Sequence, residues 1–164
     1  MRYAEIKKND IANGYGIRVS LWTQGCPHKC KDCFNQSTWD YNKGHLFTDK
    51  ELAYIKSLLS DPNIHRNFSI LGGEPLLKQN IERLTTIIIE LKKEFPKLNI
   101  WIWTGYTWGE ISHLEILKYI DILVDGRFEV DKKDLMLKYR GSTNQRIIDV
   151  KESLKQNKII LADI

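Results

Sequence analysis

Apolar segments alternate with amphipathic segments over residues 16–125, and this alternation limits the folds that the chain can adopt. The apolar segments are short, rich in β-branched and aromatic residues, and followed by loops that contain glycine. We expect four strands, at residues 16–23, 67–71, 100–104 and 121–124. Strands joined through helices in this way predict a parallel sheet whose functional loops follow the carboxyl ends of the strands.

Helix start and stop signals lie between the expected strands. Thr48–Glu51 is a capping box, whose threonine and glutamate side chains satisfy free amides at a helix start, and Asp61-Pro62 ends that helix. A single apolar stripe predicts a second helix over Leu77–Phe95. Thr107–Glu110 is another capping box and predicts a third helix that reaches Leu117.

The part of the chain after these segments is less regular. Residues 127–145 resemble a loop with a short helical turn, Arg146–Val150 a strand, and Lys158–Leu161 a last strand after a short helix. The chain has 164 residues, whereas a complete eight-unit β/α barrel needs roughly 200–250. A fold built from β/α units would therefore hold roughly four to six of them and leave a barrel incomplete.

Composition and charge exclude several classes of protein. Hydrophobic residues make up 42% and charged residues 28% of the chain, so neither a disordered nor a fibrous protein is expected. The 25 basic and 21 acidic residues are mostly interleaved, so we expect no direct nucleic-acid partner. No apolar run approaches the ~18 residues of a membrane span, and Met1–Lys8 lacks the apolar core of a signal peptide. We therefore expect a cytoplasmic protein without a membrane partner.

The three cysteines, Cys26, Cys30 and Cys33, lie together in the loop that follows the first expected strand. An odd number of cysteines argues against a disulfide framework. Soft sulfur ligands favour zinc, copper(I) or an iron–sulfur cluster. Structural zinc needs four ligands, and no second Cys-x-x-Cys pair closes such a site, although His28 or His45 remains a possible fourth ligand. The spacing therefore favours a four-iron cluster with one iron left free, with zinc as the alternative.

The second expected strand runs directly into Gly72-Gly73-Glu74-Pro75. Two glycines allow the backbone to approach a ligand without a Cβ in the way. Glu74 then places a carboxylate acceptor at the end of the strand. Because the first two expected strands are consecutive, the cysteines and this segment are expected at the same edge of the sheet.

The cysteine loop and Gly72–Pro75, in this order and at consecutive strand ends, resemble the motifs of radical S-adenosylmethionine (SAM) enzymes. Further segments narrow the resemblance to the activating proteins of anaerobic (class III) ribonucleoside-triphosphate reductase. These segments are Cys33-Phe34-Asn35, Ser37–Asp40, Trp103–Tyr106, Asp125–Phe128 and Arg140–Arg146. The resemblance extends from about Asn13 to Val150. It implies one radical SAM domain over residues 1–164, an α/β fold with an incomplete (β/α) barrel and a mostly parallel sheet.

The resemblance also implies which residues hold the cofactors. Each of the three cysteines would bind one iron of a [4Fe–4S] cluster, and SAM would chelate the fourth iron. Gly72 and Gly73 would present backbone to the amino group of SAM, with Glu74 as a nearby acceptor. Asp32 and Phe34 would line the cofactor, Asp32 through its backbone and Phe34 through its ring. Many radical SAM enzymes carry an aromatic residue just before the third cysteine, where this chain has Asp32.

The activity implied by the resemblance is the cleavage of SAM to a 5′-deoxyadenosyl radical, which makes a glycyl radical on the reductase. No cysteine remains for a second cluster, so the electron would come from an external donor such as a flavodoxin-like protein. One alternative is an activase of another glycyl-radical enzyme, of the formate-lyase type. The other alternative, from a different class, is a zinc- or cluster-binding redox module without catalysis.

Several other residues have simpler interpretations. From strand alternation, four aromatic residues are expected to pack in the core or at the sheet edge: Trp22, Phe34, Trp101 and Trp103. His28 is expected to be a solvated loop histidine. Arg18 is expected to pair with a carboxylate of the chain or of the cofactor. Asp125-Gly126 is expected to be a plain turn.

Overall fold

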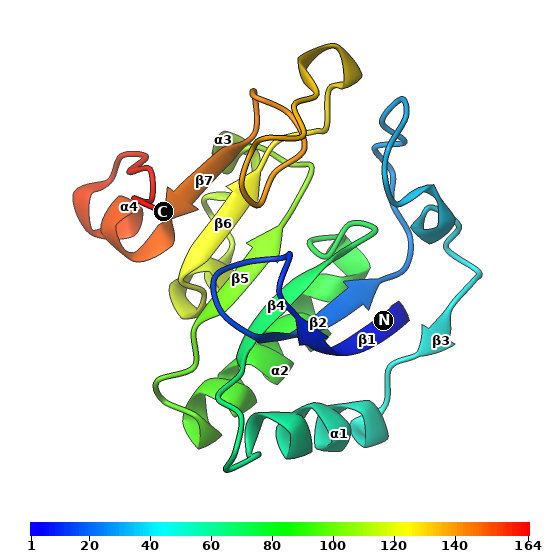
Figure 1. Cartoon of the computed structure of the whole chain (residues 1–164), viewed down its shortest axis with the longest axis vertical. Coiled ribbons are helices and arrows are strands. Elements are labelled where there is room, and N and C mark those ends of the chain that lie inside the picture. Colours follow the sequence, from blue (N-terminus) through cyan, green and yellow to red (C-terminus); the bar gives the residue numbers. More distant parts are fainter.

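The computed structural model describes residues 1–164, which form a seven-stranded sheet flanked by helices (Figure 1). The strand order across the sheet is β3-β1-β2-β4-β5-β6-β7. The strands are β1 (Arg2–Asp10), β2 (Arg18–Thr23), β3 (His45–Leu46), β4 (Asn67–Gly72), β5 (Ile100–Trp103), β6 (Ile122–Asp125) and β7 (Arg146–Asp149). The helices are α1 (Asp49–Leu59), α2 (Lys78–Glu94), α3 (Trp108–Ile111) and α4 (Val150–Gln156).

The four strands predicted from the sequence form the parallel centre of the sheet. Neighbours β2, β4, β5 and β6 all pair in parallel, which confirms that part of the prediction. Both edges are antiparallel, because β1 pairs with β2 and β3, and β7 pairs with β6. The sheet ends at β3 and β7 and is not closed, so the structure confirms an α/β fold with a parallel centre but not a barrel.

Two elements differ from the sequence prediction. Lys158–Leu161 is not a strand and contributes only an isolated bridge between Leu161 and Ile148. The helix expected to reach Leu117 ends at Ile111 and is followed by a 3-10 turn at Glu115–Tyr119. These two short elements bury the same apolar residues that one longer helix would have buried. Hydrophobic periodicity alone therefore could not distinguish the two structures.

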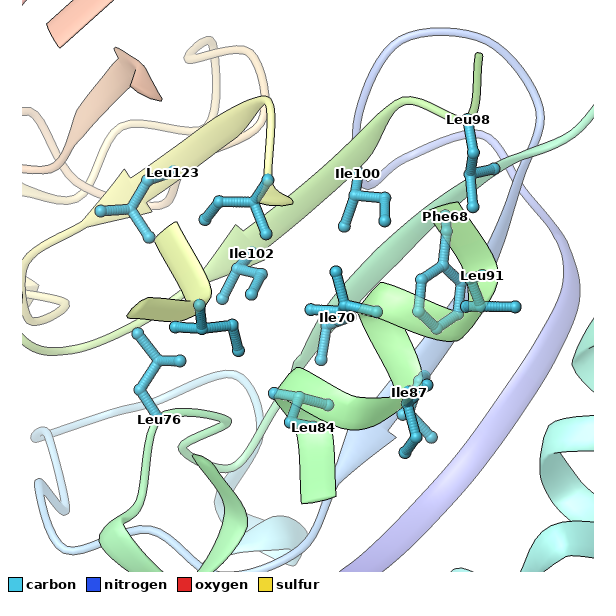
Figure 2. Close-up of a cluster of buried hydrophobic side chains, with 14 of the residues drawn as sticks. Phe68, Ile70, Leu76, Leu84, Ile87, Leu91, Leu98, Ile100, Ile102 and Leu123 are labelled. Carbon is cyan, nitrogen blue, oxygen red and sulfur yellow. The ribbon is translucent and has the colours of Figure 1, made fainter. Parts of the chain in front are cut away.

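Helices α1 and α2 cover one face of the sheet and enclose the main hydrophobic core (Figure 1). Figure 2 shows side chains of α2 facing those of the central strands, among them Leu84 and Leu91 opposite Ile70 and Ile100. Burying one such side chain contributes roughly 1.5–3 kcal/mol. Since strand side chains alternate between faces, the same strands present a second set of residues to the uncovered face. No helix combines the length and apolar character that a membrane span needs.

Asp121, just before β6, joins three elements at the amino end of the parallel strands. Its Oδ2 accepts a hydrogen bond from the amide of Ile100 at 2.7 Å and pairs with Lys92 Nζ at 2.9 Å, and its Oδ1 pairs with Lys151. Burial by itself would raise the pKa of this carboxyl, but hydrogen bonds from Lys151, Ile100 and Lys92 outweigh it and lower the pKa. The ionised carboxylate therefore stabilises the fold.

We expect Asp121→Asn to lower the free energy of unfolding by about 1–3 kcal/mol near neutral pH. The lowered pKa adds stability above the unfolded-state pKa of about 3.9, and this stability is lost as the pH falls through the folded-state value. The gap between wild type and variant should therefore shrink in acid. Urea unfolding at about pH 7 and about pH 3 measures it, with exposed Asp131→Asn as the control. A gap that does not change with pH would contradict this account.

Candidate functional site

A cavity of about 400 Å³ lies at the carboxyl ends of the parallel strands. Its walls include Trp22, Leu71 and Trp103, whose positions alternate along β2, β4 and β5 with those of the helix-covered core. The loop after β2 and the segment after β6 extend beyond this end of the sheet and complete the walls (Figure 1). The loops that the sequence predicts to be functional therefore lie beside this cavity, at the carboxyl edge of the sheet.

The cysteine loop, residues 24–35, directs all three thiols toward this cavity. None of the cysteines is in a disulfide. The loop turns at Lys29 and Asp32, which have left-handed φ angles of 46° and 55°. Its first part is fixed by a backbone hydrogen bond of 2.7 Å from the amide of Gly25 to the carbonyl of Thr38. One short, folded loop thus brings three sulfur atoms to one space.

The surroundings of the thiols act on their ionisation in opposite directions. Burial raises the pKa of the Cys26 thiol to about 11, although two backbone amides of the loop act the other way. Burial also raises the pKa of Cys30. The amide of Asn35 donates a hydrogen bond of 3.3 Å to Sγ of Cys33. Amide donors of this kind stabilise thiolates and tune iron–sulfur clusters, so the loop already carries groups suited to charged sulfur ligands.

The three thiols are soft ligands of the kind that hold iron–sulfur clusters. The structure contains no group of three His, Cys, Asp or Glu side chains arranged to hold one metal ion. A four-iron cluster makes no such demand, because each cysteine binds a different iron and the sulfurs surround the cluster. Three soft ligands beside a cavity of this size therefore suit a [4Fe–4S] cluster with one iron open to another ligand.

Gly72 and Gly73 line the cavity, and contacts within the chain also require them to be glycine. Gly72 has a φ of +108°, and a Cβ there would lie 2.7 Å from the backbone of Thr23. A Cβ on Gly73 would lie 2.4 Å from the carbonyl oxygen of Gly25. From the sequence, these glycines are expected to allow the close approach of a ligand. In the structure, the glycines also allow the loop after β4 to pack against the start of the cysteine loop.

The carboxylate of Glu74 is fully buried and does not line the cavity. Its Oε1 accepts hydrogen bonds from the amide of Leu76 and the hydroxyl of Thr104, both at 2.8 Å. Its Oε2 accepts one from the amide of Gly105 and lies within hydrogen-bonding distance of His28 Nε2, again both at 2.8 Å. These four partners occupy both oxygens. The predicted contact with the SAM amino group stays a prediction, and the observed partners belong to the chain itself.

The side chain of His28 is buried, so the expectation of a solvated histidine is wrong. Its side chain is 4% exposed, and its ring packs edge-on against Tyr106 with 4.6 Å between the ring centres. A Cβ on Gly105 would lie 2.3 Å from the same ring. The histidine therefore fastens the cysteine loop to the loops after β4 and β5. Its partner Glu74 is 46 positions away in the sequence, so the loop sequence alone gave no sign of the pairing.

The two residues predicted to line the cofactor lie in different environments. The ring of Phe34 lines the cavity and lies 5.1 Å from the ring of Phe128, measured between centres. Asp32 is exposed and does not line the cavity. Trp22 and Trp103 do line it, so the packing role expected for them is incomplete. The aromatic walls of the cavity come from β2, from the cysteine loop and the residues just after it, from β5, and from the segment after β6.

The segments at 125–129 and 140–146 interlock beside the cavity. Asp125, expected to be part of a plain turn, is 1% exposed and forms a two-bond ion pair with Arg146, whose Nε lies 2.9 Å from Oδ1. Gln145 accepts a hydrogen bond from the amide of Gly141 at 2.9 Å and donates one to the carbonyl of Gly126 at 3.0 Å. These side chains, which sequence reasoning missed, hold the segment after β6 in a defined shape.

Arg18 lies at the opposite, amino end of the strands and takes no part in the cavity. Its guanidinium is fully buried and donates hydrogen bonds to the carbonyls of Phe68 at 2.7 Å and Asn99 at 3.0 Å, and to the hydroxyl of Ser69 at 2.5 Å. Burial lowers its pKa to about 10. The expected pairing with a carboxylate is wrong, because neutral oxygens of the chain fill its donor positions.

Comparison with known families agrees with the site. A family model described as a 4Fe-4S single cluster domain matches residues 12–148. The match spans the cysteine loop, the Gly72–Pro75 loop and the interlocked segments after β6. The fold and the site therefore define an α/β protein of the iron–sulfur cluster class.

Curated relatives narrow this class. Over 147 aligned residues, the chain is 42% identical to the anaerobic ribonucleoside-triphosphate reductase-activating protein of Enterobacteria phage T4. The aligned residues make up 90% of this chain and 93% of the relative. Proteins of the same name from Vibrio cholerae and Escherichia coli K12 are 41% and 39% identical, over 90% and 88% of this chain and 97% and 96% of their own lengths. The chain belongs to the family of anaerobic ribonucleoside-triphosphate reductase-activating proteins.

We expect His28→Ala to lower the free energy of unfolding of the iron-free protein by about 1–3 kcal/mol, because it removes one partner of a buried carboxylate. Hydrogen exchange of residues 26–35 should become faster in the same variant. Urea unfolding and exchange measured by mass spectrometry check both effects. His113→Ala, at an exposed histidine, is the matched control. Equal stability and equal exchange in the two variants would show that the pair does not hold the loop.

Proposed function

We propose that the chain is a radical SAM activase that generates a glycyl radical on anaerobic ribonucleoside-triphosphate reductase. Cys26, Cys30 and Cys33 would hold a [4Fe–4S] cluster, which would supply the one-electron chemistry needed to cleave bound SAM and so to remove a hydrogen atom from a glycine Cα of the reductase. The proposal treats residues 1–164 as a single radical SAM domain. The proposal goes beyond family membership, because the family name specifies a reductase but not the chemistry that activates it.

One observation carries the proposal: the cysteine loop and the Gly72–Pro75 loop line the same cavity. Cys26, Cys30 and Cys33 reach it from the end of β2, and Gly72 and Gly73 reach it from the end of the adjacent β4. A site that only stored a cluster would need the cysteines alone. A second loop and an aromatic wall beside them provide room for an organic ligand next to the open iron.

The residues of the chain have separate tasks in this proposal. The three cysteines would hold the cluster, and the amide of Asn35, which already bonds to Cys33 Sγ, would help to stabilise the sulfur charge. Phe34 and Trp103 would cover the reacting region and exclude water from it. Asp32, which is exposed, would contribute only through the turn that it makes.

We further propose that SAM binds through the backbone of Gly72 and Gly73. Glu74 would then favour SAM binding by holding this backbone in place, in addition to any direct attraction between its charge and the amino group. Each oxygen of Glu74 already has two partners, so a direct hydrogen bond to SAM would have to replace one of them. The two routes make different predictions for His28.

The partners follow from the same chemistry. The protein substrate would be a segment of the reductase, as the names of the relatives indicate for those proteins. All three cysteines of the chain are used by the one cluster. An external one-electron donor, such as a flavodoxin-like protein, would therefore reduce it.

We expect anaerobically reconstituted protein to contain about four irons and four sulfides per chain. It should release 5′-deoxyadenosine when SAM and dithionite are added. Cys30→Ala should lose this activity while keeping most of its secondary structure, because the residue is half-buried in a loop. Full deoxyadenosine formation by Cys30→Ala would show that the cysteine assignment is wrong. Absence of the product from the wild type would favour a cluster module without catalysis.

The identity of the protein substrate has its own test. Mixing the reduced holoprotein and SAM with anaerobic ribonucleoside-triphosphate reductase should produce the EPR doublet of a glycine-centred radical. A formate-lyase-type enzyme under the same conditions should give none. The reverse result would assign the chain to that other class of glycyl-radical enzyme.

We expect Glu74→Ala to weaken SAM binding by about 1.5–3 kcal/mol, the usual contribution of a hydrogen bond to a charged group. If Glu74 acts through the loop, His28→Phe should also weaken SAM binding, although His28 carries no charge complementary to the amino group. Calorimetric titration of the reconstituted variants measures both affinities, and exposed His113→Phe is the control. An effect of Glu74→Ala without any effect of His28→Phe would favour direct contact instead.

A further inference from the structure

We propose that Leu135, Met136 and the basic residues around them form a docking surface for the reductase segment that carries the target glycine. This inference rests on the proposed function, since it assumes a protein substrate that must reach the cavity. The surface lies on the segment that follows β6. Figure 1 shows this segment, in gold and orange, beyond the same end of the sheet as the cysteine loop.

The docking surface exposes two large apolar side chains to solvent, which is unfavourable in the free protein. Met136 is 89% exposed and Leu135 is 78% exposed, the two highest values among the large hydrophobic side chains of the chain. Leu135 also lines the cavity into which the cysteines point. A partner that covers these side chains would therefore lie directly over the cavity entrance. Adjacent exposed apolar residues of this kind commonly mark sites of protein contact.

The exposure of these side chains is built into the backbone of the segment. Asp134 Oδ1 accepts a hydrogen bond of 2.8 Å from the amide of Met136, and the amide of Asp134 donates to the carbonyl of Gly141 at 3.2 Å. Lys133 and Ser142 form an antiparallel bridge at the base of the same turn. Because the turn is held in this shape before binding, docking would cost little further ordering of the chain.

Charge indicates which kind of segment fits. The cysteine loop (24–35) and the segment 127–140 together carry seven basic and four acidic residues. Lys133 lies 5.0 Å above the ring of Phe34, so positive charge reaches the rim of the cavity itself. The complementary partner is a segment with apolar side chains next to its glycine and an excess of acidic residues.

This occupant fits the rim better than a second copy of the chain does. A copy that docked here would cover the cavity entrance, and the proposed chemistry requires a glycine of another protein to enter it. It would also bring two surfaces with an excess of positive charge together, which is unfavourable. The reductase segment has neither disadvantage.

The test compares two double variants of the reconstituted holoprotein. Met136→Glu/Lys138→Glu changes the docking surface at two exposed positions that do not line the cavity. Ile89→Glu/Lys93→Glu makes the same two kinds of change on the exposed side of α2, far from the cavity. Both variants change the net charge equally. The affinity for the purified reductase is measured by calorimetry, and SAM cleavage by dithionite is measured without reductase.

We expect the Met136→Glu/Lys138→Glu variant to bind the reductase about tenfold or more weakly, as for changes at central interface residues. Its SAM cleavage should match that of the wild type. The Ile89→Glu/Lys93→Glu variant should match the wild type in both reductase affinity and SAM cleavage. Added salt should weaken binding of the wild type more than binding of the Met136→Glu/Lys138→Glu variant. Equal reductase affinity of the two variants would overturn the docking surface.

A failure of the proposed function would be seen separately. If wild-type holoprotein does not cleave SAM, the activase mechanism fails, yet the comparison of reductase affinities still tests the docking surface. Sedimentation of the holoprotein alone tests the other occupant. A dimer that the Met136→Glu/Lys138→Glu variant disrupts would assign the surface to a second copy and contradict the proposal.

Discussion

The buried carboxylate of Glu74 is the interaction on which the arrangement of the site depends. A carboxyl group without partners is costly to bury, and the four hydrogen-bonding contacts of Glu74 offset this cost. Those contacts come from the cysteine loop, from the loop after β4 and from the end of β5. Three loops that are distant in sequence are therefore held in one arrangement by a single side chain.

The central sheet separates stability from function by its two faces. One face packs against α1 and α2 through aliphatic residues such as Ile70 and Ile102, which are 0% exposed. The other face presents Trp22 and Trp103 to the cavity. Because side chains of a strand alternate, substitutions in the covered core and substitutions in the cavity wall can vary independently.

The sequence predicted the elements whose signals are local. The four parallel strands, the capping box at Thr48 and the long helix α2 were all predicted, because hydrophobic period and turn chemistry are contained within each segment. Strand β1 was missed, since its polar sequence Arg2–Asp10 has no apolar run and gains its structure from pairing with β2 and β3. The isolated bridge at Leu161 shows the reverse case, an apolar run without a partner strand.

For the site, too, the sequence predicted the features that have local signals and missed those that depend on distant residues. Spacing located the cysteines and the glycines, and adjacency of their strands explains why they share a cavity. Spacing did not reveal the burial of His28 or the pairing of Asp125 with Arg146, since each depends on a partner brought near only by the complete fold. Long-range polar pairs of this kind are the part of a site that local patterns do not encode.

The segment after β6 combines a rigid base with an exposed tip, and this combination has a physical reason. The Asp125–Arg146 pair and Gln145 fix the base against the sheet, where any movement would also displace the cavity wall at Gly126. Met136, at the tip of the segment, is not constrained in this way, because its side chain does not contribute to the core. The exposed side chain of Met136 therefore does not stabilise the fold. Its neighbour Leu135 lines the cavity, which agrees with the proposed contact with a partner at this rim.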